Sequence, residues 1–281
     1  MLAKKFKGEI ISVDSRGIYR GLEIGSSAVA GKWVKKNGKN IFIYKTIPHH
    51  LVATVNPEKT FSAFDFAKSA TKLIKKIEIP ILVGGSGFWL DALTQPDLLA
   101  DAPPNRGLRK KLSSFSKTKL LSILKKYNPG KAGQMQKLPA RKIIRAIEIA
   151  DFEKRKRVKQ LKSQPQFKIL YLGLTATNPV IKTKIKKRFV KDLKRGLLTE
   201  TKKLQQAVSS PRLKELGLYY PIIADYQKGK ITKDEMIERS VNTVYHYAKR
   251  QKTWFKRNPK IIWVKNKKQA LQLVQKFLAA K

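Results

Sequence analysis

The chain has 281 residues, of which 62 are lysine or arginine and 19 are aspartate or glutamate, so its formal charge is +43. A hydrophobic content of 42% supports a folded core, while the excess of cations must lie on the surface and favours nucleic acid as partner. A lysine-rich proteome would be a second source of this charge. Disulfides and thiolate metal sites are excluded because cysteine is absent. Neither a signal peptide nor a membrane-spanning run is present, so we expect a cytoplasmic protein with no membrane partner.

The N-terminal third shows the pattern of an α/β protein with a parallel sheet. Residues 9–13 are short, apolar and β-branched, as in a buried strand, and residues 41–44 form a second candidate strand. Helical spacing follows over 61–77. A third strand over 79–83 then runs through Gly84–Gly87 into another helix. This order predicts parallel strands covered by helices.

Two prolines within 101–105 interrupt that pattern, and lysine-rich helical segments follow to about residue 164. We therefore expect an α/β core made of residues 1–100 and 166–281, with a small helical insertion over 101–165. Inside the insertion, Pro139 begins a helix. That helix is expected to bury one face and to place three charged residues on another face, namely Arg141, Arg145 and Glu148.

After the insertion, residues 167–175 predict a further core strand, and a helix begins at Asn178-Pro179. The buried stripe of this helix is expected to comprise Ile181, Ile185, Phe189, Leu193 and Leu197. A line of cations runs beside it, formed by Lys184, Arg188, Lys191 and Arg195. The last long helix opens with a capping box from Thr232 to Glu235 and continues to about Lys256.

Two candidate sites lie where strands end, which is where open parallel sheets bind ligands. Asp14, followed by Ser15 and Arg16, ends the first strand, and a carboxylate there can act as a general base or hold a metal ion. It can equally cap the next turn. The amides of Gly84–Gly87 can bind a phosphate at a helix N-terminus, or the segment can be a plain tight turn.

Three other segments suggest chemistry. Residues 25–33 imitate a P-loop but have one residue too many, and Trp33 replaces the hydroxyl residue. His49 and His50 have no third ligand nearby, so we expect them in a loop and assign no metal site. The final helix alternates cations with Trp254, which suits phosphates and an unpaired base, although Trp254 can instead belong to the core.

The motifs occur in a characteristic order. They are Glu-Ile-Ile-Ser-Val-Asp-Ser-Arg at 9–16, Ile-Tyr-Arg-Gly-Leu at 18–22, Ile-Pro-His-His-Leu at 47–51, Pro-Ile-Leu-Val-Gly-Gly-Ser-Gly at 80–87, Arg-Lys-Ile-Ile-Arg-Ala-Ile-Glu at 141–148, Leu-Gly-Leu-Thr at 172–175, Leu-Gly-Leu-Tyr-Tyr at 216–220 and Tyr-Ala-Lys-Arg-Gln-Lys-Thr-Trp-Phe at 247–255. With them the chain resembles the tRNA dimethylallyltransferase (isopentenyltransferase) family over nearly its whole length.

The resemblance implies a core like that of P-loop NTPases and transfer of a dimethylallyl group from dimethylallyl diphosphate to the adenosine 3′ of the anticodon in tRNA. Asp14 would be the base, and Arg188 with Lys184 would bind the diphosphate. Mg²⁺ would be the cofactor and the protein a monomer. The insertion would contact tRNA, and the contacts implied are Asp14, Ser15, Arg16, Gly17, Ser86, Arg141, Lys142, Arg145, Lys249, Arg250, Gln251, Thr253, Trp254 and Lys256.

Four features depart from the family pattern. Gly17 stands where the family usually has glutamine, Ser86 where it has threonine, and Ala28 where lysine is common. The P-loop and the first strand are expected upstream of Leu2, which would weaken or remove the Mg²⁺ site. An inactive tRNA-binding remnant is the alternative to an enzyme. An enzyme for free nucleotides fits the charge poorly, and a purely structural RNA-binding protein gives no reason for Asp14.

Overall fold

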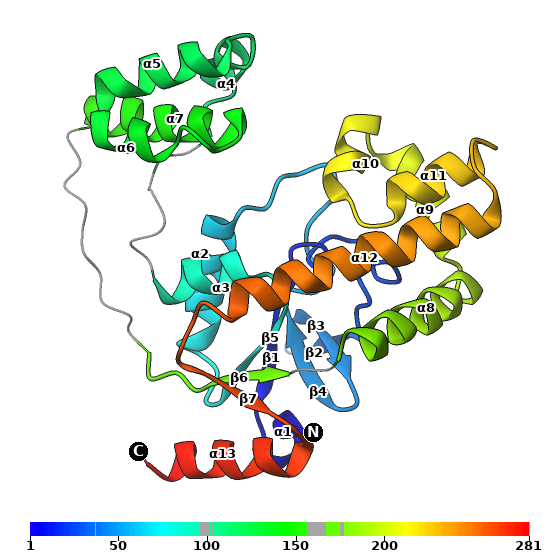
Figure 1. The fold of residues 1–281 in the computed structure, drawn as a ribbon. Helices are drawn as coiled ribbons and strands as arrows, with labels where there is room; N and C mark the ends of the chain where they lie inside the picture. The colour runs from blue at the N-terminus through cyan, green and yellow to red at the C-terminus, as the bar shows by residue number, and fades with distance from the viewer. Residues whose placement is uncertain (37, 96–101, 103, 157–166, 175–176, 281) are drawn as a thin grey trace. The chain divides into compact units, whose positions relative to one another are not determined.

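The computed structural model describes the chain except residues 37, 96–101, 103, 157–166, 175–176 and 281 (Figure 1). It divides into two compact units. One comprises Met1–Thr94 and Gln166–Lys281, and the other comprises Gln95–Pro165. Within the described residues, no helix is both long and apolar enough to cross a membrane.

The first unit contains a five-stranded sheet with the order β2-β3-β4-β1-β5. Its centre is β1 (Glu9–Val13), which pairs in parallel with β4 (Ile47–His50) and β5 (Pro80–Gly84). β2 (Lys32–Lys36) and β3 (Lys39–Tyr44) extend it as antiparallel strands. The strands predicted around residues 9–13, 41–44 and 79–83 are confirmed, as is the α/β class with a sheet flanked by helices.

The expectation of a loop at His49 and His50 is wrong, because both lie in β4. This strand forms only when β1 and β3 supply hydrogen bonds on its two sides. His49 contacts the rings of Phe42 and Tyr44, while His50 Nε2 lies 2.5 Å from a carboxylate oxygen of Glu9. The adjacent side chains therefore point to different surroundings.

Two helices that contact each other precede and follow β5 along the chain. α2 (Ala63–Ile74) begins with a capping box, in which the side chains of Ser62 and Asp65 bind each other's backbone N–H groups. α3 (Gly87–Thr94) follows the glycine turn after β5. Phe66 of α2 stacks on Trp89 of α3 with ring centroids 4.9 Å apart, which joins the two helices.

A smaller parallel sheet pairs β6 (Tyr171–Leu174) with β7 (Ile261–Val264). The prediction of a core strand over residues 167–175 is wrong in its bounds and in its burial, although residues 175–176 lie outside the described part. β6 has a single strand partner among the described residues, its first three residues are partly buried, and Leu174 is 84% exposed. Short helices stand near the two ends of the chain, α1 (Leu2–Lys5) and α13 (Lys267–Ala279).

Five helices complete the first unit, and α12 contacts α3, α8 and α11 (Figure 1). They are α8 (Asn178–Lys194), α9 (Leu197–Ala207), α10 (Ser210–Leu216), α11 (Tyr220–Gln227) and α12 (Lys233–Phe255). The capping box at Thr232 is confirmed. The predicted stripe of α8 is only partly correct: Gly196, with φ of 100°, separates Leu197 from this helix, and Asp192 is buried beside Ile185 and Phe189.

The second unit is a helical cluster of α4 (Arg106–Ser113), α5 (Lys117–Tyr127), α6 (Pro129–Gln134) and α7 (Ala140–Lys156). Its core contains Leu120, Leu124, Ile143 and Ile147. The expectation that Glu148 shares an outer face with Arg141 is wrong, since its side chain is only 1% exposed.

Glu148 can be buried because its carboxylate accepts four hydrogen bonds from three residues. Arg109 donates to both carboxylate oxygens at 2.9 and 2.7 Å, Arg145 Nη1 donates at 2.5 Å, and the backbone N–H of Asn105 donates at 2.5 Å. A carboxylate that is paired in this way can leave water at little net cost. Burial acts to raise the pKa of Glu148, but the hydrogen bonds from Arg109 and Arg145 outweigh it and hold the pKa below its ordinary value.

Candidate active site

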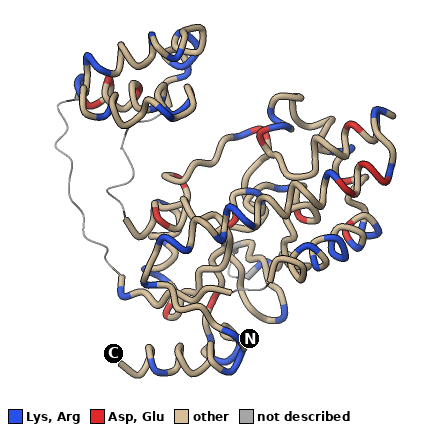
Figure 2. The backbone as a smooth tube through the Cα atoms, in the orientation of Figure 1, with Lys and Arg blue, Asp and Glu red and all other residues tan. Residues whose placement is uncertain are grey.

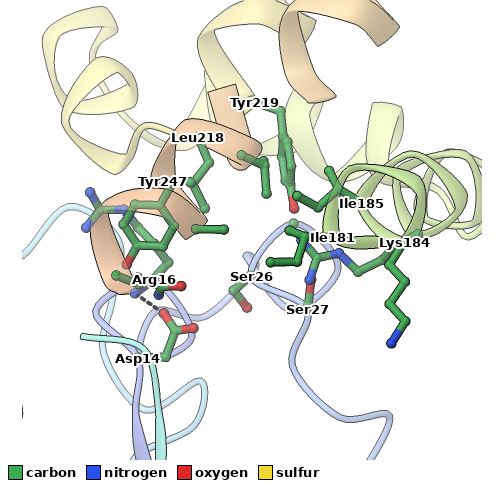
Figure 3. A pocket seen from close by; sticks show the side chains of 15 residues that line it. Asp14, Arg16, Ser26, Ser27, Ile181, Lys184, Ile185, Leu218, Tyr219 and Tyr247 are labelled. Carbon is green, nitrogen blue, oxygen red and sulfur yellow. Dashed lines mark hydrogen bonds between the residues drawn. The ribbon is translucent and has the colours of Figure 1, made fainter. Parts of the chain in front are cut away.

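A pocket of about 360 Å³ lies in the first unit, where β1 ends (Figure 3). Its walls come from five segments: the turn after β1, the loop before β2, α8, the residues that precede α11, and α12. The polar residues that line it are Asp14, Arg16, Ser26, Ser27, Lys184, Arg188, Tyr219, Tyr247 and Gln251.

Asp14 is half-buried and closes a turn on the pocket floor. Its Oδ1 accepts hydrogen bonds from the backbone N–H groups of Arg16 at 2.7 Å and Gly17 at 3.1 Å. The turn-capping interpretation of this residue is confirmed, while its role as a base stays a prediction. One carboxylate oxygen caps the turn, which holds the group in place, and the side chain also lines the pocket.

Gly17 leaves space beside this carboxylate. A Cβ atom built on Gly17 would lie 3.5 Å from Asp14 Cβ and 3.7 Å from Ser26 Oγ, which are ordinary contact distances. A Cβ atom could therefore stand here without displacing Asp14. Ala28 is not among the pocket-lining residues; it packs partly buried against the cluster of Phe42, Val52 and Ala53.

The glycine turn after β5 is joined to the end of β1. Ser86 Oγ accepts the backbone N–H of Ser15 at 2.9 Å, and the backbone N–H of Ser86 donates to Val13 at 3.1 Å. A Cβ atom on Gly84 would lie 2.1 Å from the Val13 carbonyl oxygen, so this close approach requires glycine. The hydroxyl at Ser86 thus holds the segment that carries Asp14.

Three cations surround the pocket. Lys184 and Arg188 lie one turn apart on α8, and Arg16 follows Asp14. The buried Nε of Arg16 has no hydrogen-bond partner within the described chain. Asp14 is the single acidic residue among the described residues that line the pocket, so cations outnumber carboxylates and an anionic group is favoured there.

Arg188 has a buried neighbour, Asp192, one turn along α8. Burial raises the pKa of Asp192, and the charges of Arg188 and Arg195 oppose that rise. Arg195 Nη1 donates to Asp192 Oδ1 at 3.2 Å. Arg188 also acts on Tyr219, whose pKa is raised by burial against the opposing charge of Arg188. The positive charge of Arg188 therefore acts on both a buried carboxylate and a buried phenol.

Helix α12 is attached to the glycine turn and to α3, in each case through one side-chain hydrogen bond. Gln251, which lines the pocket, donates from Nε2 to the carbonyl oxygen of Gly85 at 3.0 Å. Trp254 donates from Nε1 to Asp91 Oδ2 at 2.8 Å. The indole ring meets Phe88 edge-to-face, and the Arg257 guanidinium lies 4.3 Å from its centroid. Stacking of Trp254 on a base stays a prediction.

Four further residues predicted to contact tRNA are exposed, namely Lys249, Arg250 and Thr253 of α12 and Lys256, which caps the end of that helix. Lys249 lies 5.7 Å from the Tyr245 ring, and Arg250 lies at the same distance from Tyr247. The remaining predicted residues, Arg141, Lys142 and Arg145, belong to α7 in the helical unit. Arg141 and Lys142 are exposed, while Arg145 also donates to the carbonyl oxygen of Ala102 at 2.8 Å.

Sequence reasoning missed Ser26, Ser27, Tyr219 and Tyr247 as parts of the pocket. The segment from Gly25 fails as a P-loop, yet its first three residues line this pocket. The signal for Tyr219 was present in the Leu-Gly-Leu-Tyr-Tyr motif at 216–220, to which no role had been given. No local pattern indicated the two serines.

Comparison with known proteins gives a consistent result. The sequence model of the IPP transferase family matches residues 17–258. The chain is 34% identical to the tRNA dimethylallyltransferase of Carboxydothermus hydrogenoformans, over 97% of this chain and 88% of that protein. It is 30% identical to tRNA dimethylallyltransferase 1 of Geotalea uraniireducens, over 99% and 90%.

A solved structure agrees with these relatives. The full-length tRNA isopentenylpyrophosphate transferase of Bacillus halodurans matches with a TM-score of 0.66 and 28% identity, over 100% of this chain and 90% of that one. The match of the family model over most of the chain, together with relatives at 30% identity or more along nearly its whole length, shows that the chain belongs to the IPP transferase family.

Proposed function

We propose that this protein is a tRNA dimethylallyltransferase, which transfers a dimethylallyl group from dimethylallyl diphosphate to the exocyclic amine of the adenosine 3′ of the anticodon. The observation that carries the proposal is the pocket itself. A carboxylate at a strand end, Asp14, lines it together with the cations Lys184 and Arg188 of α8. These are the two kinds of group that the reaction needs, and they favour an enzyme over an inactive tRNA-binding remnant.

The exocyclic amine of adenine is a poor nucleophile because its lone pair is delocalised into the ring. Asp14 would accept one proton from this nitrogen as the nitrogen attacks the first carbon of the dimethylallyl group. The carbon–oxygen bond breaks at the same carbon, and diphosphate leaves with the bonding electrons. Arg188 and Lys184 would stabilise the negative charge that develops on the leaving oxygen.

Mg²⁺ would supply further stabilisation of the diphosphate when bound. The described residues contain no group of three or more histidine, aspartate or glutamate side chains that could hold a metal ion. Asp14 already uses one oxygen to close its turn. The part of the chain that the structure describes thus offers no such cluster for magnesium, and no step above depends on one.

The charge distribution supports tRNA as the second substrate. Lysine and arginine are closely spaced along α8 and recur on α12 (Figure 2). The adenine must leave its stack to reach Asp14, so contacts with the flanking nucleotides are needed. We assign them to the exposed residues of α12 and, in the helical unit, to Arg141, Lys142 and Arg145.

The test is direct turnover. The purified protein is incubated with dimethylallyl diphosphate and an anticodon stem-loop that carries adenosine 3′ of the anticodon. The RNA is then digested to nucleosides, which are separated and identified by mass spectrometry. Modified adenosine is expected with this RNA and not with one that carries guanosine at that position. Modification of free AMP at a similar rate would contradict tRNA as the substrate.

A further inference from the structure

Glu200 of α9 lies outside the pocket, yet its carboxylate reaches the loop that forms one pocket wall. It accepts the backbone N–H of Ile24 at 2.8 Å and that of Gly25 at 2.8 Å, one on each oxygen. The hydroxyl of Tyr220 donates to the same carboxylate at 3.0 Å. These contacts join parts of the chain that are about 175 residues apart in sequence.

The two amides held by Glu200 stand at the start of a tight turn. Within the turn, Ser26 N–H donates to the Leu22 carbonyl, and Ser27 N–H donates to the Ile24 carbonyl at 2.9 Å. The first N–H groups of such a turn have no partner inside it, so an outside acceptor stabilises them. Glu200 is that acceptor. The next residues along the chain, Ser26 and Ser27, line the pocket.

Tyr220 holds the same loop from another side. Its side chain is fully buried, and a Cβ atom on Gly25 would lie 2.2 Å from its hydroxyl oxygen. The preceding residue, Tyr219, lines the pocket beside Ser27 and Arg188, and both of these side chains oppose the rise that burial causes in the pKa of its phenol. Residues 219–220 thus lie between the carboxylate of Glu200 and the pocket wall formed by Ser26 and Ser27 (the serine wall), and they lie next to Arg188, which we assign to the leaving group.

From this arrangement we infer that Glu200 is a positioning residue for the pocket, which sets the place of Ser26 and Ser27 and, through residues 219–220, of Arg188. The inference rests on the proposed function, because it concerns the groups assigned to the diphosphate. Loss of the carboxylate would free the two amides and let the serine wall move. A small displacement of groups that act on the transition state lowers turnover more than it lowers binding.

The variants are Glu200→Ala and Glu200→Gln, with Thr201→Val as the matched control. Thr201 is the next residue of α9, is fully buried and donates only within its own helix, to Leu197 at 2.8 Å. We expect kcat to fall about tenfold to a hundredfold in Glu200→Ala, with the Kd for tRNA unchanged. Glu200→Gln keeps one acceptor but turns an N–H₂ group toward the other amide, so its kcat should be intermediate. The control should lose thermal stability and keep its kcat.

Hydrogen exchange supplies a readout that needs no turnover. The peptide over residues 22–28 should exchange faster in Glu200→Ala than in the unaltered protein, and at the unaltered rate in Thr201→Val. If the unaltered protein does not modify tRNA, the proposed function fails, while exchange still tests whether Glu200 holds the loop. Unchanged exchange in both Glu200 variants would overturn the inference.

Faster exchange with unchanged kcat would overturn it as well, because the loop would then be anchored by Glu200 without mattering to the reaction. Should Glu200→Ala fail to fold, Tyr220→Phe takes its place. That variant removes one donor to the carboxylate and keeps the ring, so a smaller fall in kcat of about threefold to tenfold is expected, in the direction of Glu200→Gln. A Tyr220→Phe protein with unaltered kcat and exchange would contradict the inference in that case.

Discussion

The substitution Asp14→Asn separates the two tasks of this side chain. Its Oδ1 accepts two backbone N–H groups, at 2.7 and 3.1 Å, and asparagine can keep both bonds through its carbonyl oxygen. Each bond then loses its charge-assisted character, which costs about 1 kcal/mol and hence about 2 kcal/mol in all. The protein should therefore remain folded. The amide N–H₂ group replaces the oxygen that would accept a proton, so the variant has no base.

The expected loss of rate is larger than the loss of stability. Removal of a general base lowers turnover by about 10²- to 10⁴-fold, or about 3 to 5 kcal/mol in the activation free energy. Single-turnover rates with saturating tRNA and dimethylallyl diphosphate measure it, and tRNA binding is measured in parallel and should hardly change.

Asp65→Asn is the matched control for this experiment. Asp65 also closes a turn by accepting a backbone N–H, that of Ser62 at 2.9 Å, but it lies at the start of α2 and not in the pocket. It should lose similar stability and no catalytic rate. If Asp14→Asn retained a rate within about tenfold of the unaltered protein, the assignment of the base would be refuted.

Three further outcomes are expected. Arg188→Ala should slow transfer about a hundredfold, because one preorganised cation no longer faces the leaving group. The measurement is kcat at saturating concentrations of both substrates, and a change confined to KM would contradict this prediction. Glu148→Ala should destabilise the helical unit by about 2 kcal/mol in urea unfolding, less than a fully buried pair because the guanidinium-bearing side chains of Arg109 and Arg145 are 44% and 35% exposed. Since the pKa of Glu148 is lowered from its ordinary value of 4.5, this contribution is present above that pH and lost as the pH falls through the lower value of the folded state, so the variant and the unaltered protein should converge in acid. Finally, tRNA affinity should fall steeply with salt through release of counterions, and a log–log slope shallower than about −3 would indicate fewer than about four phosphate contacts and contradict tRNA as the main partner.

Much of the architecture near the site could be predicted from local patterns. The β-branched run at 9–13, the glycine turn after β5 and the capping box at Thr232 each depend on residues a few positions apart, and each is found where it was predicted. Asp14 was singled out because parallel strands present their carboxyl ends to ligands, and it does line the pocket. Such features are decided by backbone propensity and short-range hydrogen bonds.

Other features depend on partners far away along the chain. His49 and His50 lie in a strand that pairs with β1, in which Ile10 stands opposite His49, and Glu148 is buried with Arg109, 39 residues distant, as one of its donors. The serine wall of the pocket is held by Glu200 across 175 residues. No window of sequence contains both members of these pairs, and the free energy that joins them arises only when folding brings a buried charge and its donors together. The tertiary structure therefore decides which polar residues shape the pocket and which ones stabilise the fold.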